Sequence, residues 1–513
     1  MDREKRVLEL LHQMITIDSE TATEKEQAME VYLLHVLSEI KENVWCGSLP
    51  VSNDSLGRSI VYGFIEGRRA DTLIFMNHHD VVGCEAYGKL APYAFSPEIL
   101  AEKLHHSEID LETETDLDSN EWLFGRGACD MKGGIAAQLT VFEEYAAHPE
   151  NMSLLFLSVP DEESYSAGMR SALPFLQQLQ KERNLQYRLL VNCEPNHKEQ
   201  NNLIAYTGSV GKVLPVVLVQ GKAVHISKYA EGVNPLGILA RLVSRTEGNW
   251  NLADQCEGES TPPPSWMYLR DEKKQYDFSL PWRASAYASF LTFKKTPEEV
   301  LGILKKETQA SIKVALAQAR VQYEVPVLSY EELLNKAKHI PGFFTFYNTL
   351  QYIETEKLKQ GGNYPAVTID LMAQILDFLE EREPVVVMGF APPFYPAVDS
   401  RNMGDKSFRA VLQAVTNCLP VRFDPYFTGV SDCSYCGLES TLEGTACQDN
   451  MPLWGSAYQF DWQALSDIRI PFILLGPWGK DLHCRTERVH ISSVSRILPD
   501  VLRQILTYLG KNY

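Results

Sequence analysis

One short segment, residues 122–134, constrains the fold of this chain more than any other; its sequence is WLFGRGACDMKGG. Three apolar residues lead into a Gly-Arg-Gly triplet, and two more glycines follow Asp130 closely. Glycines on both sides let the backbone turn sharply and approach a neighbouring group. Because residues 135–145 carry apolar side chains at helical spacing, Asp130 is predicted at a corner between a strand and a helix. Open α/β sheets carry functional groups at such corners, although an Asp that caps a helix beside a structural turn gives the same local pattern.

Four apolar runs are predicted as buried strands, and each is followed by side chains of the types that can bind metals or transfer protons. These runs are residues 72–76, 153–159, 188–192 and 472–475. The alternation of strand, acidic loop and helix predicts an α/β fold, in which a mixed sheet has helices on its faces. The side chains that follow the strand ends are His78, Asp80, Glu162, Glu163, Glu194 and, in a longer loop, His483.

The pattern also predicts how the chain divides into domains. Its 513 residues suffice for two large domains or about three of average size. Beyond residue 211 the order of predicted elements becomes β-α-β-β-α-β-like, which predicts a smaller α+β domain at residues 212–328. This domain would be inserted into a larger one made of residues 1–211 and 329–513.

Composition excludes some partners and compartments. A net charge of −19 argues against nucleic acid or an anionic membrane as the main partner. We find no pattern of a signal peptide and no apolar run long enough to span a bilayer. The ten cysteines show no framework spacing, so we interpret them as reduced thiols and expect the cytoplasm.

Two conspicuous segments receive no predicted function. The acidic stretch 107–121 is interpreted as a solvated loop. Cys433 and Cys436 form a C-x-x-C spacing, which could indicate a redox pair or half of a zinc site. Because no second such pair accompanies them, we interpret them as structural thiols.

The residue types at the strand ends suit a metal. Mixed carboxylate and imidazole ligands favour Zn²⁺, or Mn²⁺ and Co²⁺, and no phosphate-binding glycine loop accompanies them. Taken singly, a histidine at a strand end can be structural, and an adjacent Glu-Glu pair can be solvated surface. The order of the motifs is the stronger signal: H-x-D, then G-R-G-x-x-D-M-K-G-G, then P-D-E-E, then E-P, and finally G-P-W before a histidine.

This ordered set closely resembles the zinc-dependent aminoacylase and carboxypeptidase family, the co-catalytic metallohydrolases that include succinyl-diaminopimelate desuccinylase and peptidase T. The resemblance covers residues 1–245 and 425–513 and is looser between them. The length of the chain and the HHDVV wording at 78–82 most resemble the arginine-utilisation branch. The resemblance implies two divalent ions, zinc first with cobalt or manganese as alternatives. The implied ligands are His78, Asp130 as a bridging carboxylate, Glu163 with His483 at one metal, and Glu194 at the other.

The same resemblance implies the catalytic chemistry. Asp80 would orient the ring of His78, and Glu162 would be the general base. Neighbouring side chains on an extended backbone point to opposite sides, so Glu163 can face a metal while Glu162 faces a water. Two metals lower the pKa of a water and polarise the scissile carbonyl, and Glu162 would pass the proton of that water to the leaving nitrogen.

Further roles would fall on the inserted domain and on the late motif. His225 matches a family histidine that, in dimeric members, reaches the active site of the partner as a hydrogen-bond donor; an ordinary surface histidine is the alternative. Asn234 matches an asparagine that contacts substrate. The strand at 285–293 lacks the arginine that usually binds a substrate carboxylate, and Lys294 could replace it only as a point charge. Arg485 could meet an anion or form a surface salt bridge.

We therefore expect a metallopeptidase or amidohydrolase that cleaves the amide bond of a dipeptide or an N-acyl amino acid. It would form a homodimer through the inserted domain, with neither nucleic acid nor membrane as a partner. One alternative is a binding or regulatory protein that keeps the fold without hydrolysis. A second is a deacylase or peptidase that uses one metal.

Overall fold

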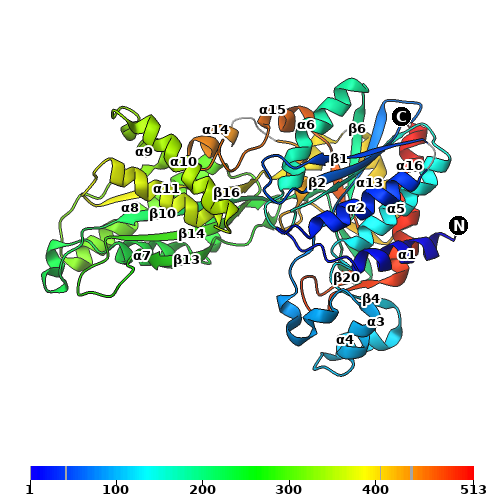
Figure 1. Ribbon diagram of the computed structural model, residues 1–513, viewed down its shortest axis with the longest axis horizontal. Coiled ribbons are helices and arrows are strands. Elements are labelled where there is room, and N and C mark those ends of the chain that lie inside the picture. Colours follow the sequence, from blue (N-terminus) through cyan, green and yellow to red (C-terminus); the bar gives the residue numbers. More distant parts are fainter. Residues whose placement is uncertain (1, 41–42, 405, 439–442, 513) are drawn as a thin grey trace. The chain divides into compact units, whose positions relative to one another are not determined.

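The computed structural model describes residues 2–40, 43–404, 406–438 and 443–512 (Figure 1). The chain forms two compact units. The first unit comprises Met1–Ser209, Val398–Gly437 and Gln463–Tyr513, and the second comprises Val210–Ala397 and Leu438–Trp462. In the described part of the chain, no helix is both long and apolar enough to cross a membrane.

The first unit is built on a nine-stranded mixed sheet. In spatial order its strands are β1 (Val44–Pro50), β2 (Ser59–Ile65), β5 (Ser153–Val159), β3 (Asp71–His78), β6 (Gln186–Asn192), β19 (Phe472–Leu474), β8 (Asn202–Tyr206) and β18 (Val421–Asp424), with β7 (Lys198–Glu199) paired to β8. The neighbours β5, β3, β6 and β19 run parallel. These four strands are almost completely buried, which explains their continuous apolar sequences. Their carboxyl ends therefore lie at one edge of the sheet.

Helices complete the core of the first unit. They are α1 (Arg3–Ile15), α2 (Glu26–Glu39), α5 (Lys132–Ala147), α6 (Ala167–Glu182), α13 (Lys406–Cys418) and α16 (Leu498–Asn512). All except α6 contribute to one hydrophobic cluster with the sheet, and Figure 1 shows α1, α2, α5 and α16 together. Since α5 is buried along most of its length, its sequence is apolar on nearly every side.

A smaller part of the first unit carries the acidic stretch. It consists of η1 (Glu85–Tyr93), α3 (Pro97–Leu104), α4 (Leu111–Ser119) and a three-stranded sheet of β4 (Trp122–Phe124), β21 (Arg488–His490) and β20 (Gly479–Lys480). The prediction of a solvated loop at 107–121 was wrong over α4. Asp110 caps this helix by accepting a 2.8 Å hydrogen bond from the Thr113 amide, and Asp116 pairs with Lys480 and Arg488 at 2.7 Å. These partners offset the repulsion among the acids.

The second unit has a five-stranded sheet with helices on both faces. In spatial order the strands are β13 (Ser265–Asp271), β14 (Arg283–Thr292), β10 (Gly211–Gln220), β16 (Val385–Tyr395) and β15 (Val327–Ser329). The helices are α7 (Pro235–Thr246), α8 (Pro297–Ala319), α9 (Tyr330–Ala337), α10 (Phe343–Lys359) and α11 (Tyr364–Phe378). α7 packs against α8, β13 and β14, whereas α9, α10 and α11 share a separate hydrophobic cluster with one face of β10 and β16.

The limits of the second unit differ from the predicted insert at 212–328. The structure keeps residues 329–397 in the second unit, where the sequence pattern had returned the chain to the larger domain. The reason is that β16 pairs antiparallel with β10 and thereby extends the same sheet. The local sequence of such a strand does not show which distant strand it will pair with.

The remaining elements are short. They are β9 (Gly208–Ser209), β11 (Gln255–Cys256), β12 (Glu259–Ser260), β17 (Val398–Asp399), α12 (Ser400–Met403), α14 (Glu443–Asp449), α15 (Trp462–Ile468), and the turns of 3₁₀ or π helix η2 (Ile226–Glu231), η3 (Trp250–Leu252), η4 (Asp432–Cys436) and η5 (Ser493–Ile497).

A close approach of helix α5 to the end of β6 explains one glycine of the opening segment. A Cβ atom on Gly134 would lie 2.4 Å from the Cys193 carbonyl oxygen and 2.8 Å from the Cys193 Cβ. We expect Gly134→Ala to lower the free energy of unfolding by about 1–3 kcal/mol, because backbone must move to admit the methyl group. Gly302→Ala in α8 is the control, since a Cβ atom added there would meet no atom of another segment within 4 Å. Alanine also favours a helix over glycine by about 1 kcal/mol. Urea unfolding of both variants measures the difference; equal effects would contradict it.

Candidate metal centre

The parallel strands of the first unit bring the predicted ligands together. β3 ends at His78, which stands opposite Val159, the last residue of β5. The turn that carries Glu162 and Glu163 follows β5, and Glu194 follows β6. His483 comes from the loop between β20 and β21. Segments far apart in sequence therefore meet at one edge of the sheet.

Asp130 lies at the centre of this group. Its Oδ1 is 3.1 Å from Nε2 of His78, and its Oδ2 is 3.2 Å from Nε2 of His483. Each histidine also faces a glutamate: His78 Nε2 is 3.4 Å from Glu194 Oε1, and His483 Nε2 is 3.2 Å from Glu163 Oε1. The two oxygens of one carboxylate thus divide the site into two halves, each with one imidazole and one further glutamate.

The spacing and the bonding of these atoms fit two cations. Zinc bonds of 2.0–2.1 Å in a tetrahedron place neighbouring ligand atoms roughly 3.3 Å apart, close to the 3.1–3.4 Å separations here. Glu163 Oε1 and Glu194 Oε1 are buried, and neither makes a well-oriented hydrogen bond among the described residues, although each lies 3.2–3.4 Å from an imidazole nitrogen. Buried carboxylate oxygens normally have a partner, and a bound cation would provide it. Potential ligand atoms of His78, Asp130 and Glu163 all lie within 4.8 Å of one another.

Asp80 connects the first histidine to the acidic turn. His78 Nδ1 lies 3.1 Å from the backbone oxygen of Asp80 and 3.4 Å from its Oδ1, so both groups fix the ring. The Asp80 carboxylate also accepts hydrogen bonds from the amides of Glu162 and Glu163, at 3.1 and 3.0 Å. One buried carboxylate therefore orients a ring and holds the turn after β5 in place.

Glu162 lies on the opposite half of the site from its neighbour. Its carboxylate is within 4.8 Å of ligand atoms of His78 and Glu194, whereas Glu163 groups with Asp130 and His78. Both side chains have ligand atoms near His78, and they come from a turn that begins beyond Asp161, with φ +71°, whereas an extended backbone was expected. Burial raises the pKa of Glu162 well above its usual range, and the nearby His78 opposes this shift. Glu162 is close enough to be a ligand as well as a base.

The ionisable side chains of the site shift the pKa values of one another. The hydrogen bond with Asp130 and the Glu163 carboxylate beside it raise the pKa of His483 to about 10. Burial raises the pKa of Glu194 to about 7 although His78 opposes it. For Asp130, burial is outweighed by hydrogen bonds from His483 and His78, which hold its pKa below the usual range. The carboxylates of the site thus favour positive charge at the imidazoles between them.

Three buried charged residues at the site were missed by the sequence analysis. Glu487 accepts hydrogen bonds from the amides of Cys129 and Asp130, both at 3.3 Å, and pairs with Arg126 at 2.5 Å. Asp432, at the start of η4, is fully buried, and neither of its carboxylate oxygens makes a well-oriented hydrogen bond among the described residues, although Ser166 lies close enough to lower its pKa. Burial raises the pKa of Asp432 to about 7. Arg126 and Glu487 stand four residues from predicted ligands, which was their only local signal.

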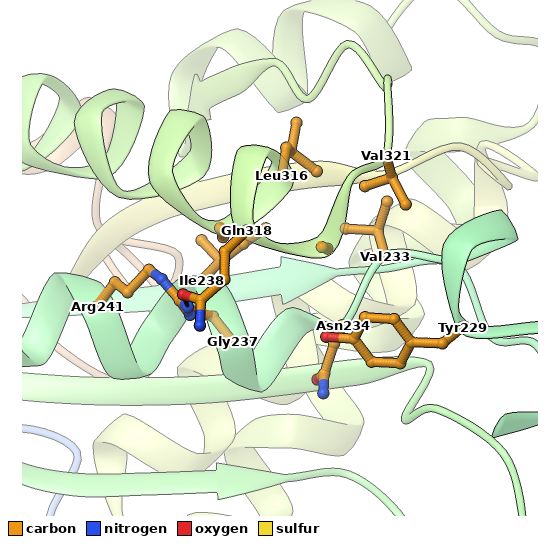
Figure 2. A pocket seen from close by; sticks show the side chains of 11 residues that line it. Tyr229, Val233, Asn234, Gly237, Ile238, Arg241, Leu316, Gln318 and Val321 are labelled. Atoms are coloured by element: carbon orange, nitrogen blue, oxygen red, sulfur yellow. Dashed lines mark hydrogen bonds between the residues drawn. The ribbon is translucent and has the colours of Figure 1, made fainter.

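Other predicted residues lie outside this group of ligands. His225 and Asn234 belong to the second unit. His225 is exposed and stacks on Phe278, with ring centroids 6.5 Å apart. Asn234 caps α7 by accepting a hydrogen bond from the Leu236 backbone amide, and it lines the pocket that Figure 2 shows. Arg485 donates a hydrogen bond to the Glu108 carbonyl oxygen.

The two cysteines of the C-x-x-C spacing are buried in η4 and form no disulfide. Cys433 Sγ accepts a weak hydrogen bond from Asn192, 3.6 Å away.

Comparison with known proteins decides the family. The sequence pattern of peptidase family M20/M25/M40 matches residues 74–495. The chain belongs to this family. It is therefore a hydrolase of the metallopeptidase type, as the order of its motifs predicted. The stretch matched includes every residue of the candidate metal centre.

Relatives match this M20 peptidase over different lengths. Protein YqjN and protein RocB, both of Bacillus subtilis, are each 28% identical, over 98% and 100% of the chain and 96% of their own lengths. Succinyl-diaminopimelate desuccinylase of Wolinella succinogenes is 29% identical over 29% of the chain and 39% of its own length.

Solved structures show the same fold. The metallo-carboxypeptidase Sso-CP2 of Sulfolobus solfataricus has a TM-score of 0.56 at 14% identity over 99% of both chains. YXEP of Bacillus subtilis, a dinuclear metal binding peptidase, has a TM-score of 0.54 at 11% identity over 99% of both chains. Together with the family match, these confirm the predicted mixed α/β architecture.

Proposed function

We propose that this M20 peptidase hydrolyses the amide bond of a small substrate, a dipeptide or an N-acyl amino acid, with two divalent ions. The supporting observation is the position of Asp130, whose two carboxylate oxygens each face the Nε2 atom of a different histidine at 3.1 and 3.2 Å. A binding protein would not need this arrangement of two matched halves. A one-metal enzyme would need only one of them.

The ligands are proposed to divide between the halves. His78 and Glu194 would hold one ion, Glu163 and His483 the other, and Asp130 would bridge. Carboxylates with imidazoles suit zinc best, and cobalt or manganese would also fit this donor set. When bound, the ions would lower the pKa of a water and polarise the scissile carbonyl.

The chain itself would move the proton. Glu162 lies beside the half formed by His78 and Glu194, and its raised pKa suits a base that must later act as an acid. It would accept the proton of the attacking water and donate it to the leaving nitrogen. Asp80 would keep the ring of His78 in position through the contacts at its Nδ1 atom.

Residues of the second unit are proposed to bind substrate in a homodimer. His225 would donate a hydrogen bond to the developing oxyanion in the partner's site, and Asn234 would contact substrate. Arg485 is a weaker candidate for binding an anionic group of the substrate. The exposed position of His225 beside Phe278, whose side chain is 64% exposed, leaves its ring accessible to another subunit.

We expect His225→Ala to reduce kcat by about 100-fold, the effect of losing one oxyanion donor, while metal content stays unchanged. His197→Ala is the control, because His197 is an exposed histidine of the first unit outside the ligand set. Steady-state kinetics with sedimentation measure activity and assembly together. A fully active monomer would contradict the proposed role of a partner histidine.

The biological setting is proposed on two grounds. The full-length likeness to protein RocB supports the arginine-utilisation branch that the chain length and the HHDVV wording suggested. Buried thiols such as Cys129, Cys193 and Cys433, none of them in a disulfide, support a reducing compartment, the cytoplasm.

A substrate screen tests the proposed activity. Metal-free protein, reconstituted with Zn²⁺, Co²⁺ or Mn²⁺, would be assayed against dipeptides and N-acyl amino acids that include arginine derivatives. We expect hydrolysis that a chelator abolishes and added metal restores. Stable metal binding without hydrolysis of any amide in the panel would favour the binding-protein alternative.

Metal binding should also release protons. At pH 7 His483, with its pKa near 10, carries a proton in the metal-free protein, yet only neutral imidazole binds a metal. We therefore expect loss of about one or more protons per chain, and an affinity that falls as the pH is lowered. Calorimetry of Zn²⁺ binding in buffers with different ionisation enthalpies measures this release. His483→Ala should release fewer protons, and heats that do not depend on the buffer would contradict the expectation.

A further inference from the structure

A buried arginine connects three segments that carry the metal centre. Arg126 follows β4 and is 1% exposed. Its Nη2 donates to the carbonyl oxygens of Gly83 and His483, at 3.2 and 3.1 Å. Its Nη1 donates to Glu487 Oε2 at 2.5 Å, and the guanidinium stacks on the ring of Tyr87, 4.9 Å from its centroid. A planar fork of donors can bind several acceptors at once, which a lysine cannot do.

Glu487 extends this connection to the bridging carboxylate. Its side chain is fully buried, and its Oε1 accepts from the amides of Cys129 and Asp130, both at 3.3 Å. The backbone of Glu487 contributes as well, because its carbonyl oxygen accepts from the Gly125 amide at 3.2 Å. The ion pair of Arg126 and Glu487 thus holds the backbone of Asp130 and of His483 in fixed relation.

The two halves of the metal centre are supported unequally. His78 is 1% exposed at the end of a central strand, and Asp80 fixes its ring. Glu194 is held through its backbone N–H, which donates a 3.2 Å hydrogen bond to Asn192 Oδ1. His483, by contrast, has a side chain that is 49% exposed and a backbone φ of +64°, in the left-handed region. Its carbonyl oxygen is held by Arg126.

We infer that Arg126 and Glu487 are a pair of positioning residues that makes metal binding in the Glu163–His483 half depend on them. The His78–Glu194 half has its own support from β3, Asp80 and Asn192. Loss of the pair should therefore weaken one of two metal ions selectively. The inference rests on the proposed two-metal function and goes beyond it, since neither residue touches a metal or substrate in that proposal.

Stepwise cobalt binding separates this inference from a general structural role. Metal-free protein would be titrated with Co²⁺ and followed by the visible absorption of each bound ion and by calorimetry. The variants are Arg126→Met, Arg126→Lys and Glu487→Gln. The matched control is Arg283→Lys, because Arg283 is a buried arginine whose partners Asp377 and Gln220 belong, like Arg283 itself, to the second unit, which contains none of the proposed metal ligands.

We expect the parent and the Arg283→Lys control to bind two equivalents. In Arg126→Met and Glu487→Gln the first equivalent should keep its affinity, and the second should bind about 10–100-fold more weakly, the usual effect of losing a group that supports a ligand. Arg126→Lys should weaken binding of the second equivalent less than Arg126→Met does, since lysine keeps the positive charge. If Arg126→Met does not fold, the two conservative variants still carry the comparison.

Each other outcome has a distinct meaning. Two equivalents with parent affinities in all folded variants would overturn the inference and leave the proposed function intact. Equal weakening of both equivalents would also overturn it, because that result indicates general loosening of the unit. A parent protein that binds no cobalt would overturn the proposed function and the inference together.

Discussion

Glu162→Gln should retain both metal ions and lose about 10²–10⁴-fold in kcat, the usual contribution of a general base. The amide has nearly the shape of the carboxylate but cannot accept a proton. The backbone N–H of residue 162, and not its side chain, donates the hydrogen bond to Asp80. The turn after β5 should therefore stay in place in the variant. Steady-state kinetics with elemental analysis of the same sample measure both effects.

Two outcomes would contradict the assignment of Glu162 as the base. Turnover at the parent rate would show that another group takes the proton. Loss of one metal ion would show that Glu162 is a ligand, a position that its distance from His78 and Glu194 allows. Glu163→Gln is the matched comparison one residue away, and it should lose metal from its own half as well as activity.

Asp130→Ala should remove both metal ions and, with them, all measurable hydrolysis. Its carboxylate contacts both histidines, with Oδ1 3.1 Å from Nε2 of His78 and Oδ2 3.2 Å from Nε2 of His483. We expect each affinity to fall by more than about 100-fold, beyond the range for groups that only support a ligand. Metal titration by calorimetry measures both steps.

The control for this prediction is Asp254→Asn. Asp254 is also buried, but in the second unit, where it accepts hydrogen bonds from the amides of Phe293, Lys294 and Lys295. It should keep full metal content. If Asp130→Ala kept one ion at parent affinity, Asp130 would be a ligand of a single metal and not a bridge. The expected loss of both ions from Asp130→Ala differs from the selective loss of one ion expected for Arg126→Met.

Local patterns predicted the elements that build the metal centre. The predicted strand 153–159 coincides with β5, and the helical spacing at residues 135–145 falls within α5. Parallel strands bury both faces, so their continuous apolar sequences stand out, and their carboxyl ends must meet at one edge. That rule was sufficient to bring His78, Glu163 and Glu194 together.

Long-range pairing could not be predicted in the same way. β16 joins β10 in a sheet of the second unit, and Arg126 pairs with Glu487 across most of the chain. Neither partner carries a local signal of the other. The acidic stretch was misjudged for a related reason, since α4 is stabilised by Lys480 and Arg488, two cations from a distant segment.

Anomalous X-ray scattering from crystals grown with Zn²⁺ tests the central claim most directly. The account predicts two zinc peaks per chain, one on each side of the Asp130 carboxylate. One should be bound by His78 and Glu194, and the other by Glu163 and His483. A single peak, or peaks bound by none of these side chains, would contradict it.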